Sequence, residues 1–392
     1  MSPEPKRVPG AEPRQGLATG GGAVTGPALS SFSQAELRSW LQARGHPAYR
    51  ADQLRRHLLH GAAGGFAAMQ DLPHQLRAEL EATAAWTSLE VLASTLADRG
   101  LTEKLLLRTA AGHEVEAVMI AHPARVGRRG RRTVCVSSQA GCAIGCVFCA
   151  TGRLGLRANL TAAEIVDQVL EAARRWEARG LGPPTNVVFM GMGEPLQNYA
   201  EVVTAIRLLR EWGVSPRQVV VSTSGLVPEI ARLAQEGLGV RLAISLHATE
   251  DQLRDRLVPL NRRYPIASLM AEASRYADAT GRRVTLEYVL MRGVNDDPAA
   301  ARRLRQLATQ IHGHVNLIPM NPVPGSGLRA PSPAACREFA SLVGPRATIR
   351  FSRGDRAAAA CGQLRASLVP DPRRERRISM MEVGLGRPRA EP

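Results

Sequence analysis

The sequence predicts an α/β fold, in which a partial TIM-type (β/α)6 barrel follows a small helical domain. From Thr133 onward, apolar strand-like runs alternate with helical patterns, an order typical of a parallel sheet covered by helices. The chain has 392 residues, enough for a barrel and an additional domain, and 44% of them are apolar. Aromatic residues make up only 4%, so aliphatic side chains must fill the core. No apolar run reaches about 18 residues, so we expect no membrane-spanning helix.

The first third of the chain divides into a tail, a helical domain and a connector of short strands. Residues 1–30 are rich in Gly, Pro and Ala, and we expect them to be disordered. Residues 31–87 show helical spacing of apolar residues, with Ser33 and Glu36 predicted to form a capping box at the first helix. Residues 88–132 change to short strand patterns separated by turns and end in the basic run ARVGRRGRR.

Residues 133–365 carry the alternating pattern of the barrel, and residues 366–392 form a basic tail that we expect to be disordered. The helix after the first barrel strand begins with a predicted capping box of Thr161 and Glu164. The predicted barrel strands are, in order, TVCVSS, NVVFMGM, QVVVSTS, VRLAISLHA, RVTLEYVLM, HVNLIPMN and ATIRFSR.

Polar residues and glycines gather at the carboxyl ends of these predicted strands. They are Ser137 and Ser138, GMGEPL (191–196), STSG (222–225), SLHA (245–248), EYVLMRGVND (287–296) and NPVPG (321–325). An ordinary turn explains any one of these segments. In β/α barrels, however, the carboxyl ends of the strands form the active site. Their repetition therefore predicts a site at that end of the barrel.

The charge of the chain favours a polyanionic partner. Its net charge is +16, from 51 basic and 35 acidic residues, and every basic residue except Lys6 and Lys104 is arginine. Codon bias explains the preference for arginine over lysine, but it does not explain the excess of basic over acidic residues. Nucleic acid is the partner that this excess favours, and the basic run at 124–132 is either a solvated linker or an RNA contact. The N-terminal segment lacks the apolar stretch of a signal peptide, so we expect a cytoplasmic protein with reduced thiols.

Three of the six cysteines fall within GCAIGCVFC, at Cys142, Cys146 and Cys149. A disulfide framework does not suit a chain of this length in a reducing compartment. A zinc site needs four ligands, with Cys135 available as the fourth, but a second pair with the usual spacing is absent. An iron–sulfur cluster fits the spacing better, because three thiolates can hold three corners of a cube and leave one iron open.

The spacing C-x3-C-x2-C directly after the first strand of a β/α barrel resembles the radical S-adenosylmethionine (SAM) superfamily. The resemblance implies a [4Fe–4S] cluster on Cys142, Cys146 and Cys149, with SAM bound at the open iron. It also implies that Phe148 packs near the SAM adenine. GMGEPL is similar to the glycine-rich segment of that superfamily, in which Gly193 and Glu194 bind the SAM amino group.

Further segments resemble a narrower family, the RlmN adenine methyltransferases of large-subunit rRNA, together with their relative Cfr. The segments are CVSSQAGC (135–142), VEAV (115–118), NVVFMGMGEPL, STSG, ISLHA, VPLNRRYPI, EYVLMRGVND, NLIPMNPVPG and AACGQL (359–364). The similarity runs from about residue 45 to residue 363, and the helical domain resembles the accessory RNA-binding domain of the family. The remaining SAM-binding positions that the resemblance implies are Ser222, Ser245, Leu246, His247 and Asn321.

The resemblance implies methylation of C2 of an adenine in 23S rRNA (the adenine-2503 type), and adenine-37 of tRNA for some members. One SAM methylates Cys361, and a second yields a radical that activates this S-methyl group for addition to C2. Glu116 then removes the C2 proton, and Cys135 attacks the Cys361 sulfur to release the product and form a disulfide. We expect closure of the barrel to bring Cys135 and Cys361 together. The chain departs from the family pattern before AACGQL, where it has Arg356 and Ala357.

Three other functions remain open at this point. The nearest is Cfr-type methylation of C8 of the same adenine, which confers antibiotic resistance. A zinc-stabilised RNA-binding protein without catalysis comes from a different class, and a glycyl-radical activase would not need Cys135 or Cys361. For the methyltransferase we expect a monomer, no membrane partner, and a reducing electron donor such as flavodoxin.

Overall fold

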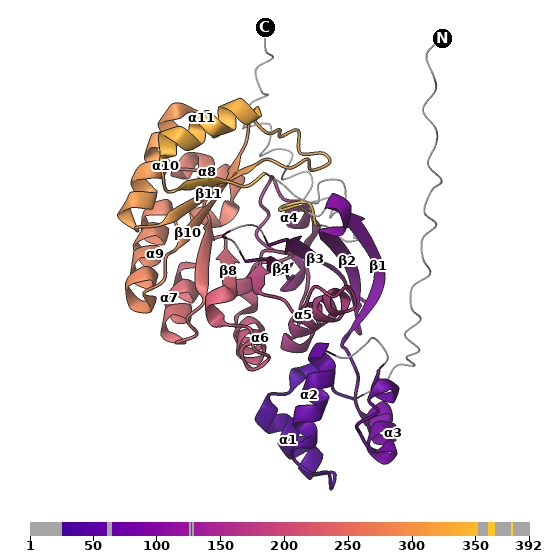
Figure 1. Cartoon of the computed structure of the whole chain (residues 1–392). Coiled ribbons are helices and arrows are strands. Elements are labelled where there is room, and N and C mark those ends of the chain that lie inside the picture. The colour runs from indigo at the N-terminus through magenta and orange to yellow at the C-terminus, as the bar shows by residue number, and fades with distance from the viewer. Residues whose placement is uncertain are drawn as a thin grey trace, which may run out of the picture.

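The computed structural model describes residues 26–60, 65–124, 127, 129–351, 360–364 and 378. Figure 1 shows a group of helices near the start of the chain, a large twisted sheet, and helices along the outer face of that sheet. The predicted α/β fold with a partial β/α barrel and an N-terminal helical region is confirmed. Within the described ranges, no helix has the length and apolar character needed to cross a bilayer.

The N-terminal helices are α1 (Gln34–Gln42), α2 (Arg50–His60) and α3 (His74–Thr83), with the short 3-10 turns η1 (Leu29–Ser31) and η2 (Phe66–Ala68). Ser33 accepts a hydrogen bond from the Glu36 backbone while the Glu36 carboxylate accepts one from the Ser33 backbone, so the predicted capping box is confirmed. Arg55 of α2 pairs with Glu211 across a distance of 2.9 Å. Because Glu211 ends barrel helix α6, this ion pair attaches the helical group to the barrel.

The helical group begins earlier than the sequence predicted. We expected residues 26–30 to belong to a disordered tail, but Leu29 and Ser30 are buried. The Leu29 backbone N–H donates to the Ala85 carbonyl, which fastens this segment beside the end of α3. The other domain boundaries remain predictions. Residues 1–25, Arg356, Ala357 and most of the C-terminal tail lie outside the described residues.

One ten-stranded sheet forms the centre of the molecule, in the order β1-β2-β3-β4-β7-β8-β9-β10-β11-β12. Its first three strands are β1 (Leu89–Ala97), β2 (Thr102–Thr109) and β3 (Glu114–His122). They pair antiparallel with one another, and β3 pairs antiparallel with β4 (Arg131–Cys135). The remaining strands are parallel to β4: β7 (Asn186–Phe189), β8 (Val219–Thr223), β9 (Arg241–Ser245), β10 (Thr285–Leu290), β11 (His314–Pro319) and β12 (Ala347–Ile349). All seven predicted barrel strands are confirmed.

Helices connect the parallel strands and cover the sheet (Figure 1). They are α4 (Ala150–Leu154), α5 (Ala162–Glu177), α6 (Tyr199–Glu211), α7 (Val227–Gln235), α8 (Asp251–Leu257), α9 (Ile266–Thr280), α10 (Pro298–Gln310) and α11 (Pro333–Val343). The predicted capping box of Thr161 and Glu164 starts α5. Strand residues such as Leu242 and Leu286 are fully buried, as expected where helices and the barrel interior cover both faces.

Strand pairing does not close the sheet into a ring among the described residues. β12 lies at one edge, and β4 is followed by β3 rather than by β12. We expected closure of the barrel to bring Cys135 and Cys361 together, and this expected cause is wrong. The segment 360–364, which carries Cys361, reaches the cavity at the carboxyl ends of the strands and performs this task instead.

Candidate active site

A small antiparallel hairpin, which the sequence did not predict, holds the loop of three cysteines. Its strands are β5 (Gln139–Cys142) and β6 (Gly155–Asn159). Gly141 has a φ of 78°, and a Cβ at this position would lie only 1.9 Å from the Gly155 carbonyl oxygen. Only glycine permits this close approach. Cys142 thus ends β5, and Cys149 directly precedes α4, so the loop is fixed at both ends.

The three cysteines line one cavity at the carboxyl ends of the parallel strands. Most of the other predicted site residues line it too: Gly193, Glu194, Ser222, Ser245, His247, Asn321 and Cys361. Burial raises the pKa of the Cys146 thiol, and the neighbouring Cys149 and Cys142 thiols raise it further. The three sulfurs therefore lie within electrostatic range of one another. Glu116, Cys135 and Leu246 do not line the cavity.

The chemistry of this donor set fits a cluster better than a single ion. Among the described residues, no group of three or more His, Cys, Asp or Glu side chains is placed to hold one metal ion. A zinc site with Cys135 as fourth ligand gains no support, because Cys135 lies outside the cavity wall. In a [4Fe–4S] cube each thiolate binds a different iron, so its ligands stand farther apart than those of one ion. Three cysteines around a common cavity meet that requirement.

The segment GMGEPL after β7 is locked to the segment STSG after β8. The Glu194 carboxylate accepts hydrogen bonds from the Ser224 backbone and hydroxyl, both at 2.7 Å. Burial raises the pKa of Glu194, and these hydrogen bonds oppose the shift. Gly193 has a φ of 106°, and a Cβ there would lie 2.7 Å from the Gln139 Cβ. The glycine is therefore required by both its conformation and its packing.

Ser222, Ser245 and His247 continue the cavity wall along β8 and β9. The two serine hydroxyls are 3.4 Å apart. His247 has a positive φ of 59°, and its Nδ1 accepts a hydrogen bond from the Val289 backbone at 3.1 Å. Burial lowers the pKa of His247 to about 3, so the ring is neutral with its proton on Nε2. The His247 and Phe148 rings pack in a T-shaped arrangement, with ring centres 4.6 Å apart.

Leu246 is placed differently from its neighbours. Its side chain is fully buried and does not reach the cavity. Its backbone N–H donates to the Glu287 carbonyl at 3.0 Å. Its carbonyl accepts a hydrogen bond from Arg254, so both backbone groups have partners within the protein. The role of Leu246 toward SAM stays a prediction.

A loop at 360–364 carries Cys361 over the cavity. The Gly362 carbonyl accepts a hydrogen bond from the Ala150 backbone at 2.8 Å, and the Asn321 side-chain amide donates to the Cys361 carbonyl at 2.9 Å. The Thr151 hydroxyl also donates to the Leu364 carbonyl. The loop is thus tied both to the residues after Cys149 and to the segment NPVPG.

Cys135 and Cys361 are brought into electrostatic range of each other. Cys135 is buried at the end of β4, and its thiol pKa is raised first by burial and then by the Cys361 thiol. Cys361 retains exposed surface, although the protein atoms around its thiol raise its pKa and Glu287 raises it further. Cys361 lines the cavity, whereas Cys135 does not.

Glu116 lies on β3, beside the strand that carries Cys135. Val118 pairs with Cys135 across β3 and β4, and Glu116 is two residues from Val118, so its side chain shares the face of Cys135. The Glu116 side chain is 5% exposed and forms an ion pair of 2.7 Å with Lys104 of β2. Sequence reasoning missed Lys104, although its rarity as a lysine in this chain was a signal.

Comparison with known proteins identifies the family. The model of the radical SAM superfamily matches residues 136–304, and that of the ribosomal RNA large subunit methyltransferase N-terminal domain matches residues 28–85. Proteins of Acidothermus cellulolyticus and Frankia alni, each named "Probable dual-specificity RNA methyltransferase RlmN", are 46% and 50% identical to this chain. These matches cover 87% and 86% of this chain, and 86% and 83% of those proteins. The chain belongs to the RlmN family.

A solved structure agrees with this family assignment. The crystal structure of a radical SAM methyltransferase from Sphaerobacter thermophilus has a TM-score of 0.82 and 48% sequence identity. The match covers 86% of this chain and 99% of that one. The fold of this RlmN-family chain is therefore that of a radical SAM methyltransferase.

Arg254 is a buried residue of this RlmN-family site that the sequence did not indicate. The side chain is fully buried, and its guanidinium donates to the carbonyls of Leu246, Ser224 and Ser245 and to the Asn261 side chain, at 2.8–3.0 Å. These partners are neutral. Burial lowers the pKa of Arg254 to about 10, which still leaves it charged at neutral pH. Cys146, Asp251 and Asp255 lie within electrostatic range of Arg254 and oppose this shift, so Arg254 supplies a positive charge near the cysteine loop.

We expect Arg254→Met to destabilise the protein by about 3 kcal/mol and to lower its iron content, because buried carbonyls lose a charged donor. Denaturant unfolding and iron analysis after reconstitution measure the two effects. Arg302→Met is a matched control, since Arg302 is exposed on α10 and should change stability by less than about 0.5 kcal/mol. Equal stability and iron content in both variants would contradict this assignment.

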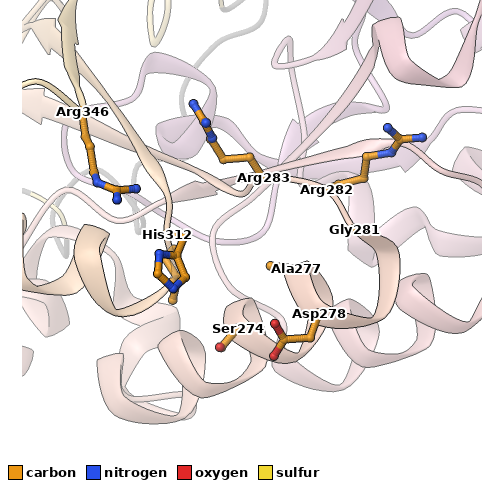
Figure 2. Close-up of a pocket in the computed structure, with 9 residues that line it drawn as sticks. Ser274, Ala277, Asp278, Gly281, Arg282, Arg283, His312 and Arg346 are labelled. Atoms are coloured by element: carbon orange, nitrogen blue, oxygen red, sulfur yellow. The ribbon is translucent and has the colours of Figure 1, made fainter.

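A second cavity of about 450 Å³ lies at the opposite end of the barrel (Figure 2). The residues around it precede β10, β11 and β12, so they sit at the amino ends of these strands. Figure 2 shows Arg283 and Arg346 on one side, with Ser274 and Asp278 on the other. This cavity contains no cysteine and lies away from the RlmN-family motifs, so we do not assign the chemistry to it.

Proposed function

We propose that this RlmN-family enzyme methylates C2 of an adenine in 23S rRNA, and also adenine-37 of tRNA, through a methyl group carried on Cys361. The observation that carries the proposal is the position of Cys361 over the cavity that Cys142, Cys146 and Cys149 line. A thiol that only supported the fold would not need to face that cavity. The C-terminal loop is instead tied by hydrogen bonds to the residues that follow the cysteine loop.

Two cofactors fit the cavity residues. Cys142, Cys146 and Cys149 would hold a [4Fe–4S] cluster, and bound SAM would supply both a methyl group and a 5′-deoxyadenosyl radical. Gly193 and Glu194 would bind the SAM amino group. The other proposed SAM contacts are the Ser222 and Ser245 hydroxyls, the His247 ring, Leu246 and Asn321. His247 is neutral, so it would offer a hydrogen-bond donor without a charge.

Three side chains of the protein would complete the transfer. Cys361 holds the methyl carbon on its sulfur and presents it to the adenine ring. Glu116, held by its ion pair with Lys104, accepts the proton that leaves C2. Cys135 then attacks the Cys361 sulfur and forms a disulfide, which breaks the bond between sulfur and the transferred carbon. The electron pair of that bond stays with the base and its CH2 group, which takes up a proton to become the methyl group. The position of Cys135 beside the Cys361 thiol supports the disulfide step.

RNA is the substrate that the charge of the chain supports. A net charge of +16 favours the phosphate backbone, and an adenine must leave its base stack to reach a cavity inside a barrel. The N-terminal helices, attached to α6 through Arg55, would provide additional contact surface.

We expect Lys104→Met to lower kcat by about 10- to 100-fold, because Glu116 loses the ion pair that holds its carboxylate in position to accept a proton. SAM cleavage should persist, since Lys104 does not line the cavity. Single-turnover rates and 5′-deoxyadenosine yield measure the two effects. Arg108→Met removes a half-exposed ion pair on the same strand and serves as the control. Equal methylation by both variants would exclude this role of Lys104.

Modification mapping tests the proposed function directly. Enzyme purified without oxygen and reconstituted with iron and sulfide is incubated with SAM, reduced flavodoxin and unmodified 23S rRNA or tRNA. The expected product is adenine methylated at C2, identified by mass spectrometry of the RNA fragments. Methylation at C8 would instead show a Cfr-type activity, and a colourless zinc protein without methylation would refute the proposal.

A further inference from the structure

Glu287 is a buried carboxylate in the active-site cavity to which no role has yet been given. It lies on β10, is 4% exposed and lines the cavity together with the cysteines. Its Oε1 accepts a hydrogen bond of 2.8 Å from the Asn316 side chain. Its Oε2 is buried and has no hydrogen-bond partner among the described residues. A buried polar atom without a partner costs free energy, so a free oxygen in a cavity indicates a bound ligand.

The surroundings of Glu287 place its free oxygen near the point of carbon transfer. In the sheet, Glu287 pairs with Ser245 on one side and with Asn316 on the other, so it continues the polar row that starts at Ser222. Glu287 also lies within electrostatic range of the Cys361 thiol, whose pKa it raises when it is ionised. The carbon that Cys361 carries must therefore be delivered beside Glu287.

We propose that Glu287 binds the target adenine by donating a hydrogen bond from its Oε2 to one of the two ring nitrogens that flank C2. This inference rests on the proposed function and extends it to base recognition. N1 and N3 of adenine are both acceptors, so a partner next to C2 must be a donor. Among carboxyl groups only the protonated form donates.

The environment of Glu287 favours that protonated form. Burial raises its pKa, while Arg350 and the Asn316 hydrogen bond act in the opposite direction. Among the described residues, the charged or titratable neighbours of Glu287 are Arg350 and the Cys361 thiol, and the strands on either side contribute neutral Ser245 and Asn316. A neutral carboxyl group can donate to either ring nitrogen of adenine, and a contact at N1 would also reject guanine, whose N1–H is a donor.

The adenine ring of SAM is the other source of the same chemistry. Position alone does not separate the two adenines, because the proposed SAM contact Ser245 pairs with Glu287 and the proposed SAM contact Asn321 bonds the Cys361 carbonyl. We favour the RNA base, because Cys361 delivers its carbon to that base and shares the cavity with Glu287. The experiment below separates the two adenines.

A cycle of protein variants and RNA analogues tests the inference. Glu287→Leu removes both oxygens, whereas Glu287→Gln keeps an acceptor for Asn316 and places an N–H donor at the position of Oε2. Each protein is assayed with RNA that contains adenine, 1-deazaadenine or 3-deazaadenine at the target position. Iron content, 5′-deoxyadenosine formation and the Kd for SAM are measured in parallel.

We expect Glu287→Leu to lower kcat/KM for RNA by about 10- to 100-fold, and Glu287→Gln to retain activity within about threefold. One deaza analogue should reduce wild-type activity strongly but cause no further loss in Glu287→Leu, which is the signature of a direct contact. If each deaza analogue reduced the activity of Glu287→Leu by the same factor as that of the wild type, the inference would be overturned. A weaker affinity of Glu287→Leu for SAM, together with a response to the analogues equal to that of the wild type, would also overturn it. If the wild type methylates no RNA at all, the proposed function fails instead.

Discussion

Cys361→Ala is expected to abolish RNA methylation, by more than about 10³-fold, while SAM is still cleaved to 5′-deoxyadenosine. The reason is that Cys361 carries the carbon, and the other thiols at the cavity are the three proposed cluster ligands. Cluster and SAM binding depend on residues before the Cys361 loop, so they should survive the substitution. Methyl incorporation into RNA and 5′-deoxyadenosine yield are measured with the same reconstituted preparation.

Cys336→Ala is the matched control for that experiment. Cys336 is buried on α11, away from the cavity, so its loss should cost about 1 kcal/mol of stability and leave methylation intact. Methylation by Cys361→Ala at a tenth of the wild-type rate or more would show that the methyl group does not pass through this sulfur. Loss of SAM cleavage in Cys361→Ala would instead assign the loop to cofactor binding.

Most of the fold follows from local sequence patterns. Barrel strands such as RVTLEYVLM are apolar along their whole length because both faces are covered, and this pattern distinguishes them from amphipathic helices. Capping boxes at Ser33 and Thr161 mark helix starts through contacts within four residues. The hairpin β5–β6 was missed because each of its strands has at most five residues and depends on the close approach at Gly141.

The site was predictable where its motifs are contiguous, and not where it depends on contacts between distant residues. GCAIGCVFC and GMGEPL locate the cavity from their spacing and position. The roles of Arg254, Lys104 and Glu287 were not predicted, because their importance comes from what they contact: three carbonyls at two strand ends, the buried Glu116, and the surroundings of the Cys361 thiol. The same limit explains why the path of the loop that carries Cys361 could not be derived from strand order.

Cys135→Ala is expected to trap a covalent complex between protein and RNA, which is the second large effect. Without Cys135 the bond between the Cys361 sulfur and the transferred carbon has no thiol to break it, so the reaction stops after one addition. Gel electrophoresis under denaturing conditions should show a shifted, nuclease-sensitive band, with multiple turnover reduced by more than about 10³-fold. The adduct should be absent in Cys135→Ala/Cys361→Ala, which lacks the attachment point.

Burial of Cys135 makes this prediction specific. Its thiol pKa is raised, so it is mostly protonated at neutral pH and does not react generally with solvent oxidants or alkylating reagents. The Cys361 sulfur is close enough to influence that pKa, and it is the partner that the fold presents. Added thiols such as dithiothreitol should therefore release the adduct only slowly, since they must enter a cavity closed by bound RNA. Normal turnover by Cys135→Ala without an adduct would mean that the carbon leaves Cys361 by another route.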